Sequence, residues 1–192
     1  LPSICIAKTI DVQLWSDSAR ISIGNHDEYT NEVNMEGSFF WNDKTKSKMF
    51  AYGITTLTSD YVEEDDKTKD KPQLFVNIGL KLFALDLGDS VTLDNTSTET
   101  AAGLSLGAEI SQNILPDTRF PIRAIVRGYY APSVVIFNND FNNMYTLSAD
   151  VEVLLQHNAI AYAGYHLISA DLKNTSAQQV DNSMHVGFKI LY

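Results

Sequence analysis

In the stretch SMHVGFKILY, residues 183–192, small or polar side chains alternate with apolar ones from Ser183 to Ile190. Successive side chains of a β-strand point to opposite faces, so a period of two predicts a strand with one apolar and one polar face. The same alternation runs through residues 146–156, where a helix would place Asp150 on the same stripe as Leu147 and Val151. Strands are therefore expected to make up nearly the whole chain.

Turn-like stretches divide the chain into about ten strands. The expected ranges are 19–26, 30–41, 47–59, 72–82, 85–94, 98–111, 120–131, 143–155, 158–170 and 182–192. Residues 1–18 are expected to form an N-terminal leader or an extra short strand, and residues 19–192 a barrel. The predicted fold class is all-β, an antiparallel up-and-down transmembrane β-barrel.

Composition narrows the class of protein. The chain has 192 residues, of which 44% are hydrophobic and 20% are charged, so a folded domain is expected. Its net charge of −10 would be repelled by a phosphate backbone, which argues against nucleic acid as a partner. A membrane helix would need about 18 to 20 consecutive apolar residues, and none occurs, whereas the strands of a membrane barrel alternate. The single Cys5 has no intramolecular disulfide partner.

The small and polar face of the strands separates two kinds of barrel. A soluble β-barrel has an apolar interior and carries its charges outside. Here the polar face combines Ser, Thr and isolated charges of both signs with glycines: Gly24, Gly53, Gly79, Gly103, Gly107, Gly164 and Gly187. Such a face suits a cramped polar lumen, so the apolar face is expected to contact lipid. A soluble lipocalin-like barrel stays open as the alternative.

The connections suggest an orientation. Segments 171–181, 132–142, 95–97, 60–71 and 27–29 fall at one end and are longer on average than 156–157, 111–119, 83–84 and 42–46. Outer-membrane barrels have longer extracellular loops than periplasmic turns, so the first set is expected outside. Segment 60–71 is rich in carboxylates that could hold Ca²⁺ or bridge divalent ions to lipopolysaccharide, but it lacks the spacing and glycine of an EF-hand. A solvated loop is the simpler interpretation.

Four motifs carry a family resemblance. They are Ile21-Ser-Ile-Gly24 followed by Glu28-Tyr-Thr-Asn31, then Gly128-Tyr-Tyr-Ala-Pro-Ser133, Ala163-Gly-Tyr-His166 and His185-Val-Gly-Phe188. In their order and spacing, over residues 20 to 192, the chain resembles the YfaZ family of Gram-negative outer-membrane barrels. The resemblance implies a ten-stranded barrel in the bacterial outer membrane, and it brings no reaction or catalytic residues with it.

Inward-facing charges are the strongest candidate site. A narrow barrel lets opposite charges meet across its lumen, and buried charges must be paired. The predicted lumen charge network consists of Arg123, Arg127, Asp150, Glu152, Glu109, Lys81, His166 and Lys189. One interpretation is a salt-bridged lumen held closed, and the other is a narrow path for ions or small polar solutes.

Catalysis is not expected. Among the histidines, His26 and His166 are the candidates for a hydrolase site at the external rim. Acidic residues that follow His26 in the sequence do not by themselves establish a catalytic arrangement in space. No phosphate loop, zinc-ligand spacing or nucleophile elbow occurs, so neither a cofactor nor a metal is expected.

The apolar, aromatic-ended last strand predicts how the protein reaches its membrane. Phe188, Ile190 and Tyr192 form the pattern that outer-membrane barrels present to the barrel-assembly machinery. The expected function is an outer-membrane barrel with a structural or protein-interaction role in the cell envelope, and a small channel and a rim-active hydrolase are the alternatives. Expected partners are outer-membrane lipid and lipopolysaccharide, the barrel-assembly machinery and an envelope protein.

Overall fold

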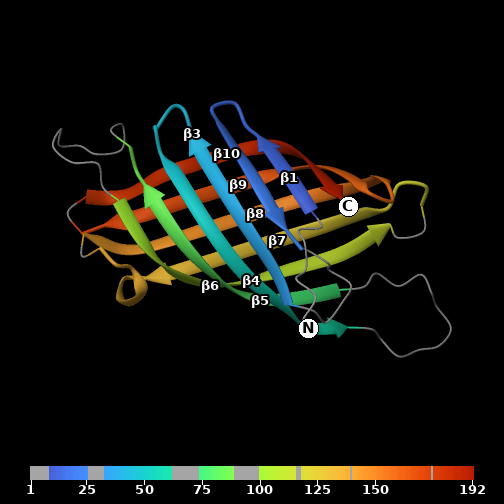
Figure 1. The fold of residues 1–192 in the computed structure, drawn as a ribbon, viewed down its shortest axis with the longest axis horizontal. Helices are drawn as coiled ribbons and strands as arrows, with labels where there is room; N and C mark the ends of the chain where they lie inside the picture. The colour runs from blue at the N-terminus through green and yellow to red at the C-terminus, as the bar shows by residue number, and fades with distance from the viewer. Residues whose placement is uncertain are drawn as a thin grey trace.

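The computed structural model describes residues 9–25, 33–61, 74–88, 100–115, 118–138, 140–173 and 175–192. Its elements are β1 (Thr9–Leu14), β2 (Ser18–Gly24), β3 (Val33–Asn42), β4 (Lys48–Tyr61), β5 (Leu74–Asp86), β6 (Thr100–Leu115), β7 (Ile122–Pro132), the 3₁₀ helix η1 (Ser133–Val135), β8 (Phe141–Gln156), β9 (Ala159–Leu172) and β10 (Thr175–Leu191) (Figure 1). No helix among these residues is long and apolar enough to cross a membrane.

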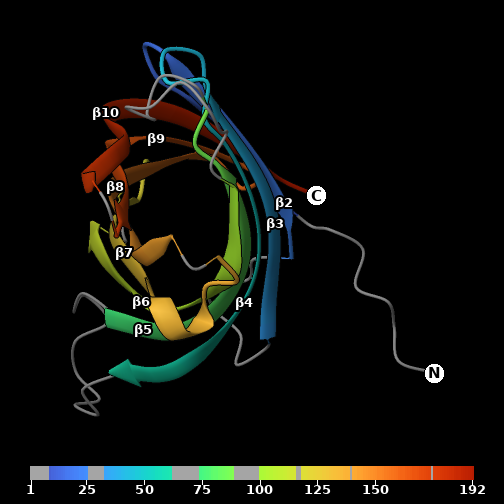
Figure 2. The ribbon, with the colours of Figure 1, turned by 90° about the vertical axis from the view of Figure 1, so that its left-hand side faces the viewer.

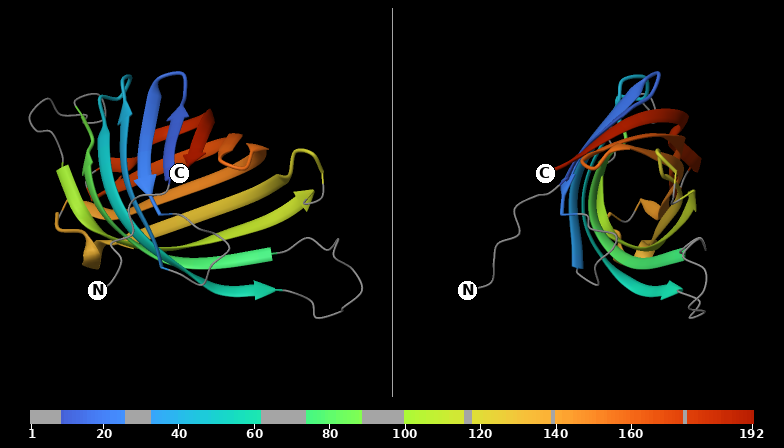
Figure 3. Two further views of the ribbon diagram at one scale, coloured as in Figure 1. Left: turned by 45° about the vertical axis from the view of Figure 1, so that its right-hand side comes forward. Right: turned by 90° about the vertical axis from the view of Figure 1, so that its right-hand side faces the viewer.

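The strands close into one barrel. Each strand pairs antiparallel with its neighbours in sequence, and β1 pairs with β10 to complete the ring. Views along the barrel show this ring directly (Figures 2 and 3). The predicted all-β, antiparallel barrel of about ten strands is therefore confirmed.

The strands differ from the predicted ranges chiefly at residues 1–18, at Phe83–Ala84 and at the start of β10. Of the two alternatives for residues 1–18, the structure contains the short strand, β1, which is part of the ring. The predicted break at Phe83 and Ala84 is wrong, because β5 continues through both residues to Asp86. Phe83 and Leu85 both point inward and are buried in an apolar cluster, so the polar half of the alternation disappears there although the strand continues.

The continuous β5 changes which connections share an end of the barrel. The end where Thr9 lies opposite Leu191, here called the terminal end, also holds the β4–β5 connection and the β8–β9 turn. The opposite end holds the β3–β4 turn, the β7–β8 connection and the short β9–β10 turn. The predicted grouping of long loops at one end is therefore wrong. The predicted loop 171–181 is also wrong, because most of it belongs to β9 and β10. The acidic part of segment 60–71 lies outside the described residues.

The alternation of the sequence separates an outer and an inner wall. Each of the ten strands exposes large apolar side chains on the outside, for example Ile21, Leu80 and Val186 at 43%, 42% and 60% exposure. The outward charged residues Lys48 and Asp86 lie at strand ends. The barrel is thus apolar where it is exposed.

The inner wall has two zones. Towards the opposite end it is apolar, and a buried cluster fills the barrel with side chains that include Phe40, Phe83, Ile136, Phe141 and Ile168. Ile136 belongs to the β7–β8 connection and forms a bridge with Gly103, where a Cβ atom would come within 2.7 Å of the Val135 carbonyl oxygen. Towards the terminal end the inner wall is ionic. The expectation of a polar lumen therefore holds for part of the barrel only, because the apolar cluster occupies the rest.

Candidate functional site

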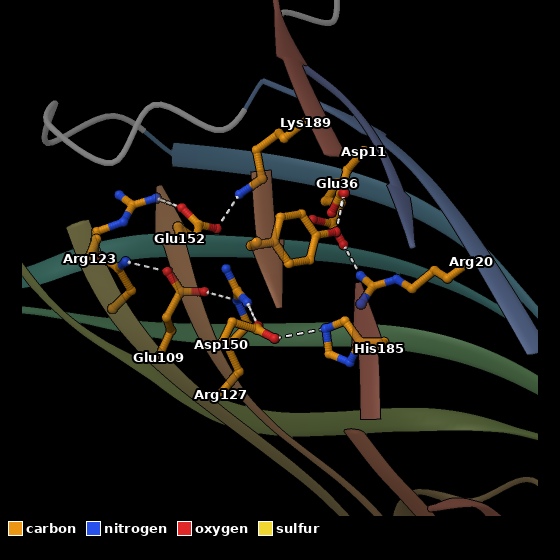
Figure 4. Close-up of polar contacts among 12 residues, drawn as sticks. Asp11, Arg20, Glu36, Glu109, Arg123, Arg127, Asp150, Glu152, His185 and Lys189 are labelled. Carbon is orange, nitrogen blue, oxygen red and sulfur yellow. Dashed lines mark hydrogen bonds and ion pairs between the residues drawn. The ribbon is translucent and has the colours of Figure 1, made fainter. Parts of the chain in front are cut away.

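The ionic zone centres on Arg127 of β7. Its Nε atom donates to Glu109 of β6 at 2.5 Å, and its Nη1 atom donates to Asp150 of β8 at 2.6 Å. Arg127 thus joins three adjacent strands across the inner wall (Figure 4). Both carboxylates are almost fully buried, at 4% exposure each. A planar guanidinium suits this task because its donors form a fixed fork.

A second group of ion pairs lies beside the first. Arg123 pairs with Glu152, which stands directly opposite it in the β7–β8 register. Glu152 also accepts a hydrogen bond from Lys189 of β10 at 2.8 Å. One buried carboxylate therefore bridges cations from two strands, and all three side chains are visible together in Figure 4. Removing either cation would leave Glu152 partly uncompensated in a low-dielectric space.

A tyrosine connects the ionic zone to the first strand. Tyr162 of β9 donates a hydrogen bond to Asp11 of β1, although β10 lies between these two strands. The ring passes over Gly187 of β10, where a Cβ atom would overlap the ring. The absence of a side chain at Gly187 is therefore what lets the phenol reach Asp11.

Arg20, Lys81 and Tyr129 form the wall that faces the centre of the lumen. Arg20 of β2 donates to Glu36 of β3 at 2.5 Å. The Lys81 ammonium lies 4.0 Å from the centre of the Tyr129 ring, an arrangement in which the negative face of the ring attracts a cation. A Cβ atom at Gly79 or Gly107 would collide with Tyr129, so these two inward glycines make room for it.

Two histidines lie between the ionic and apolar zones. His185 Nε2 lies 2.8 Å from Asp150 Oδ1, and His166 Nδ1 lies 3.6 Å from Asp181 Oδ2. The Trp15 ring lies against both imidazoles, with ring centres 5.2 Å from His185 and 5.6 Å from His166. These contacts place His166 inside the barrel at 5% exposure, so its assignment to an external rim is wrong.

The described residues do not test the rim site, and they hold no metal cluster. His26 lies outside them, so the structure gives no rim site built on the two histidines. In the same described part of the chain, no group of three or more His, Cys, Asp or Glu side chains is arranged to hold a metal ion.

Two small cavities lie among the described residues that line the lumen. The first has a volume of about 40 Å³ and reaches from Lys81 and Tyr129 to Thr9, Gly24 and Asn34 near the strand ends. The second, also about 40 Å³, lies on the apolar side of Arg20, Lys81 and Tyr129, which line both cavities. A water needs roughly 10 to 15 Å³ by this measure, so each cavity has room for about three waters.

The predicted network residues are distributed over three settings. Six of them lie in the two groups of ion pairs: Arg123, Arg127, Asp150, Glu152, Glu109 and Lys189. Lys81 lies in the same lumen against Tyr129, and His166 lies nearer the apolar cluster with Asp181.

Other inward residues with polar contacts in the lumen were not predicted as site residues. These are Asp11, Arg20, Glu36, Tyr129, Tyr162, Asp181 and His185. Asp11 and Arg20 could have been found by extending the alternation into β1 and β2, where each lies between outward apolar residues. Tyr129 continues the inward alternation of Arg123 and Arg127, but aromatic side chains are common on both faces of strands, so neither Tyr129 nor Tyr162 was singled out.

The proposed assembly residues lie on the outer wall. Phe188 and Ile190 are outward residues of β10, opposite Val12 and Ile10 of β1, and Tyr192 follows the strand at 62% exposure. Their outward position is compatible with recognition by another protein, which stays a prediction.

Comparisons with known proteins give a general likeness. No family model matches the chain, and no curated protein matches it. Among solved structures, the chain is similar to the crystal structure of the outer membrane channel DcaP of Acinetobacter baumannii, with 10% sequence identity and a TM-score of 0.40. The alignment covers 95% of this chain and 54% of that one, so the chain spans about half the length of that channel.

Proposed function

We propose that this protein is an integral β-barrel of the bacterial outer membrane. The observation that carries the proposal is the inverted polarity of the barrel: each strand exposes large apolar residues outside, while ion pairs lie inside. In water this arrangement would expose an apolar surface all around the molecule and is the reverse of a soluble barrel. In a bilayer the same surface contacts lipid. A closed sheet has no edge strand whose backbone N–H and C=O groups would lack hydrogen-bond partners.

The interior favours a closed barrel with a structural or protein-interaction role. Buried ion pairs link β6, β7, β8 and β10 in the ionic zone, and the apolar cluster fills the opposite end. The two cavities described are small, about 40 Å³ each, which favours a lumen without a continuous wide channel. The four motifs that resemble the YfaZ family support the same class of envelope barrel, and membership of that family is part of this proposal.

Cell fractionation tests the membrane assignment. The protein is expected in the outer-membrane fraction of a Gram-negative host and in solution only after detergent extraction. Recovery of folded protein in detergent-free buffer would contradict the proposal and favour the lipocalin-like alternative. Circular dichroism of both fractions distinguishes folded barrel from aggregate.

Planar-bilayer recording tests the closed lumen. Wild-type protein is expected to insert without steady conductance, in membranes where a porin added afterwards conducts normally. The first cavity, which reaches the strand ends, is the feature that favours a channel as the second candidate. Steady, ion-selective conductance by wild type would establish that candidate and contradict the closed barrel.

A further inference from the structure

The second cavity has an unusual lining. Its polar side carries two cations, Arg20 and Lys81, together with the hydroxyl-bearing Ser38. Its apolar side includes Met49, Phe83 and Met144. Of the described residues that line this cavity, none is Asp or Glu. A small ligand there would meet positive charge on one side and hydrocarbon on the other.

The two cations differ in how they are compensated. Arg20 pairs with Glu36 at 2.5 Å. For Lys81, the described residues supply the face of Tyr129 at 4.0 Å and no carboxylate within ion-pair distance. An aromatic ring compensates a buried ammonium only in part, and a buried charge needs a counter-charge. Lys81 therefore presents an ammonium beside the cavity that forms no ion pair with the carboxylates of the described residues.

The carboxylates that line the first cavity have other hydrogen-bond partners. Its carboxylates Glu36 and Glu109 are each engaged by an arginine at 2.5 Å, and Asp11 accepts the hydrogen bond from Tyr162. None of these three carboxylates lies within ion-pair distance of Lys81. The Lys81 ammonium is therefore free to pair directly with an anion from outside the chain.

We infer that the second cavity binds a short-chain monocarboxylate, such as acetate or propionate. The carboxylate lies at Lys81 and Arg20, and the alkyl tail packs against Met49 and Met144. The volume of about 40 Å³ equals that of about three waters and matches a ligand of a few heavy atoms. Methionine side chains adapt their shape, so they can accommodate a tail one methylene longer. Chloride satisfies the charge but makes no use of the apolar side.

The first cavity offers the route of entry. It reaches the strand ends at Thr9, Gly24 and Asn34, and it shares Arg20, Lys81 and Tyr129 with the second cavity. A carboxylate entering from the terminal end passes through a cavity whose lining includes Lys81. The lysine side chain has four rotatable bonds, so it can follow the anion from one cavity to the other.

Saturation-transfer NMR on the detergent-solubilised full chain tests this inference, with propionate as the probe and propylammonium as a probe of similar size and opposite charge. Saturable transfer to the propionate methyl group is expected, with none to propylammonium. Lys81→Met keeps the side-chain length and leaves no ion pair broken, and it is expected to weaken propionate binding by about tenfold or more. Lys48→Met makes the same change on the outer wall and should leave binding unchanged.

Three results would overturn the inference. They are absence of saturable propionate binding to wild type, equal binding by Lys81→Met and wild type, and complete competition by chloride at equal concentration. The first and third are measured on wild type and so do not depend on how the variant folds. Lys81→Arg retains the charge and should retain most of the affinity, which distinguishes a role of the charge from damage to the barrel.

Discussion

The hydroxyl of Tyr162 on β9 donates a hydrogen bond to Asp11 on β1, over the top of Gly187 on the strand between them. β1 is the shortest strand of the barrel and completes the ring by pairing with β10. The Tyr162–Asp11 hydrogen bond therefore adds a side-chain link across the place where the barrel closes. Its partners lie far apart in the sequence and meet only because the ring is complete.

Replacing Tyr162 with phenylalanine is expected to destabilise the barrel. The change removes the only donor described for a buried carboxylate, and an unsatisfied buried acceptor costs about 1 to 3 kcal/mol. Denaturant unfolding in detergent measures the difference. Tyr165→Phe is the matched control, because the Tyr165 hydroxyl binds Asn182 on the exposed outer wall, and it should change stability by less than about 0.5 kcal/mol. Equal effects of the two variants would show that the link to Asp11 contributes nothing.

Arg127→Met is expected to lower the free energy of unfolding by about 3 to 5 kcal/mol. The substitution keeps most of the side-chain volume but leaves Glu109 and Asp150 as buried carboxylates without their shared cation. Lys46→Met is the control, since Lys46 pairs with Asp43 at 2.7 Å in an exposed turn. Solvent screens such a pair, so its loss should cost less than about 1 kcal/mol. A stability of Arg127→Met within 1 kcal/mol of wild type would indicate that water fills the ionic zone.

The outer wall can be tested with an added charge at two depths. Leu147 is an outward residue in the middle of β8, and Leu147→Arg is expected to cost about 2 to 4 kcal/mol in a lipid bilayer. Gln156→Arg adds the same charge at the end of β8, where headgroups and water reach it, and should cost about 0 to 1 kcal/mol. Urea unfolding from lipid vesicles measures both variants. A neutral Leu147→Arg would contradict contact between this face and lipid.

The apolar cluster predicts a contrast between two phenylalanines. Phe40 is 1% exposed within the cluster, so Phe40→Ala removes buried contacts and leaves a cavity, at a cost of about 3 to 5 kcal/mol. Phe50 is 52% exposed on the outer wall, and Phe50→Ala should cost much less in detergent. Thermal unfolding of the two variants gives the comparison. Similar losses would mean that the cluster is not a well-packed core.

The alternation in the sequence determined which face of each strand is apolar. Because side chains alternate along any extended chain, local residue order was enough to place Arg123, Arg127, Asp150 and Glu152 on one wall. The same rule covers Asp11 and Arg20 once β1 and β2 are counted as strands. Strand class, barrel class and inward charges thus follow from local periodicity.

The alternation of polar and apolar residues is absent where both faces of a strand are apolar, so it does not indicate a strand there. Around Phe83 and Leu85 the inner wall belongs to the apolar cluster, so no polar residue marks the inward positions of β5. A turn was predicted there for that reason, and the error moved the connections after it to the wrong end. A local sequence pattern identifies a strand only where the two faces of that strand meet different surroundings.

The tertiary structure alone decided which inward side chains contact one another. Lys189 reaches Glu152 from a strand two places away, and Tyr162 reaches Asp11 across β10. Lys81 faces Tyr129 and the cavities, although its sequence position resembles that of the paired cations. The physical reason is that the direction of a side chain is set by its own strand, whereas its distance to a partner depends on how ten strands are staggered and closed. Such pairings are long-range, and no short stretch of sequence contains them.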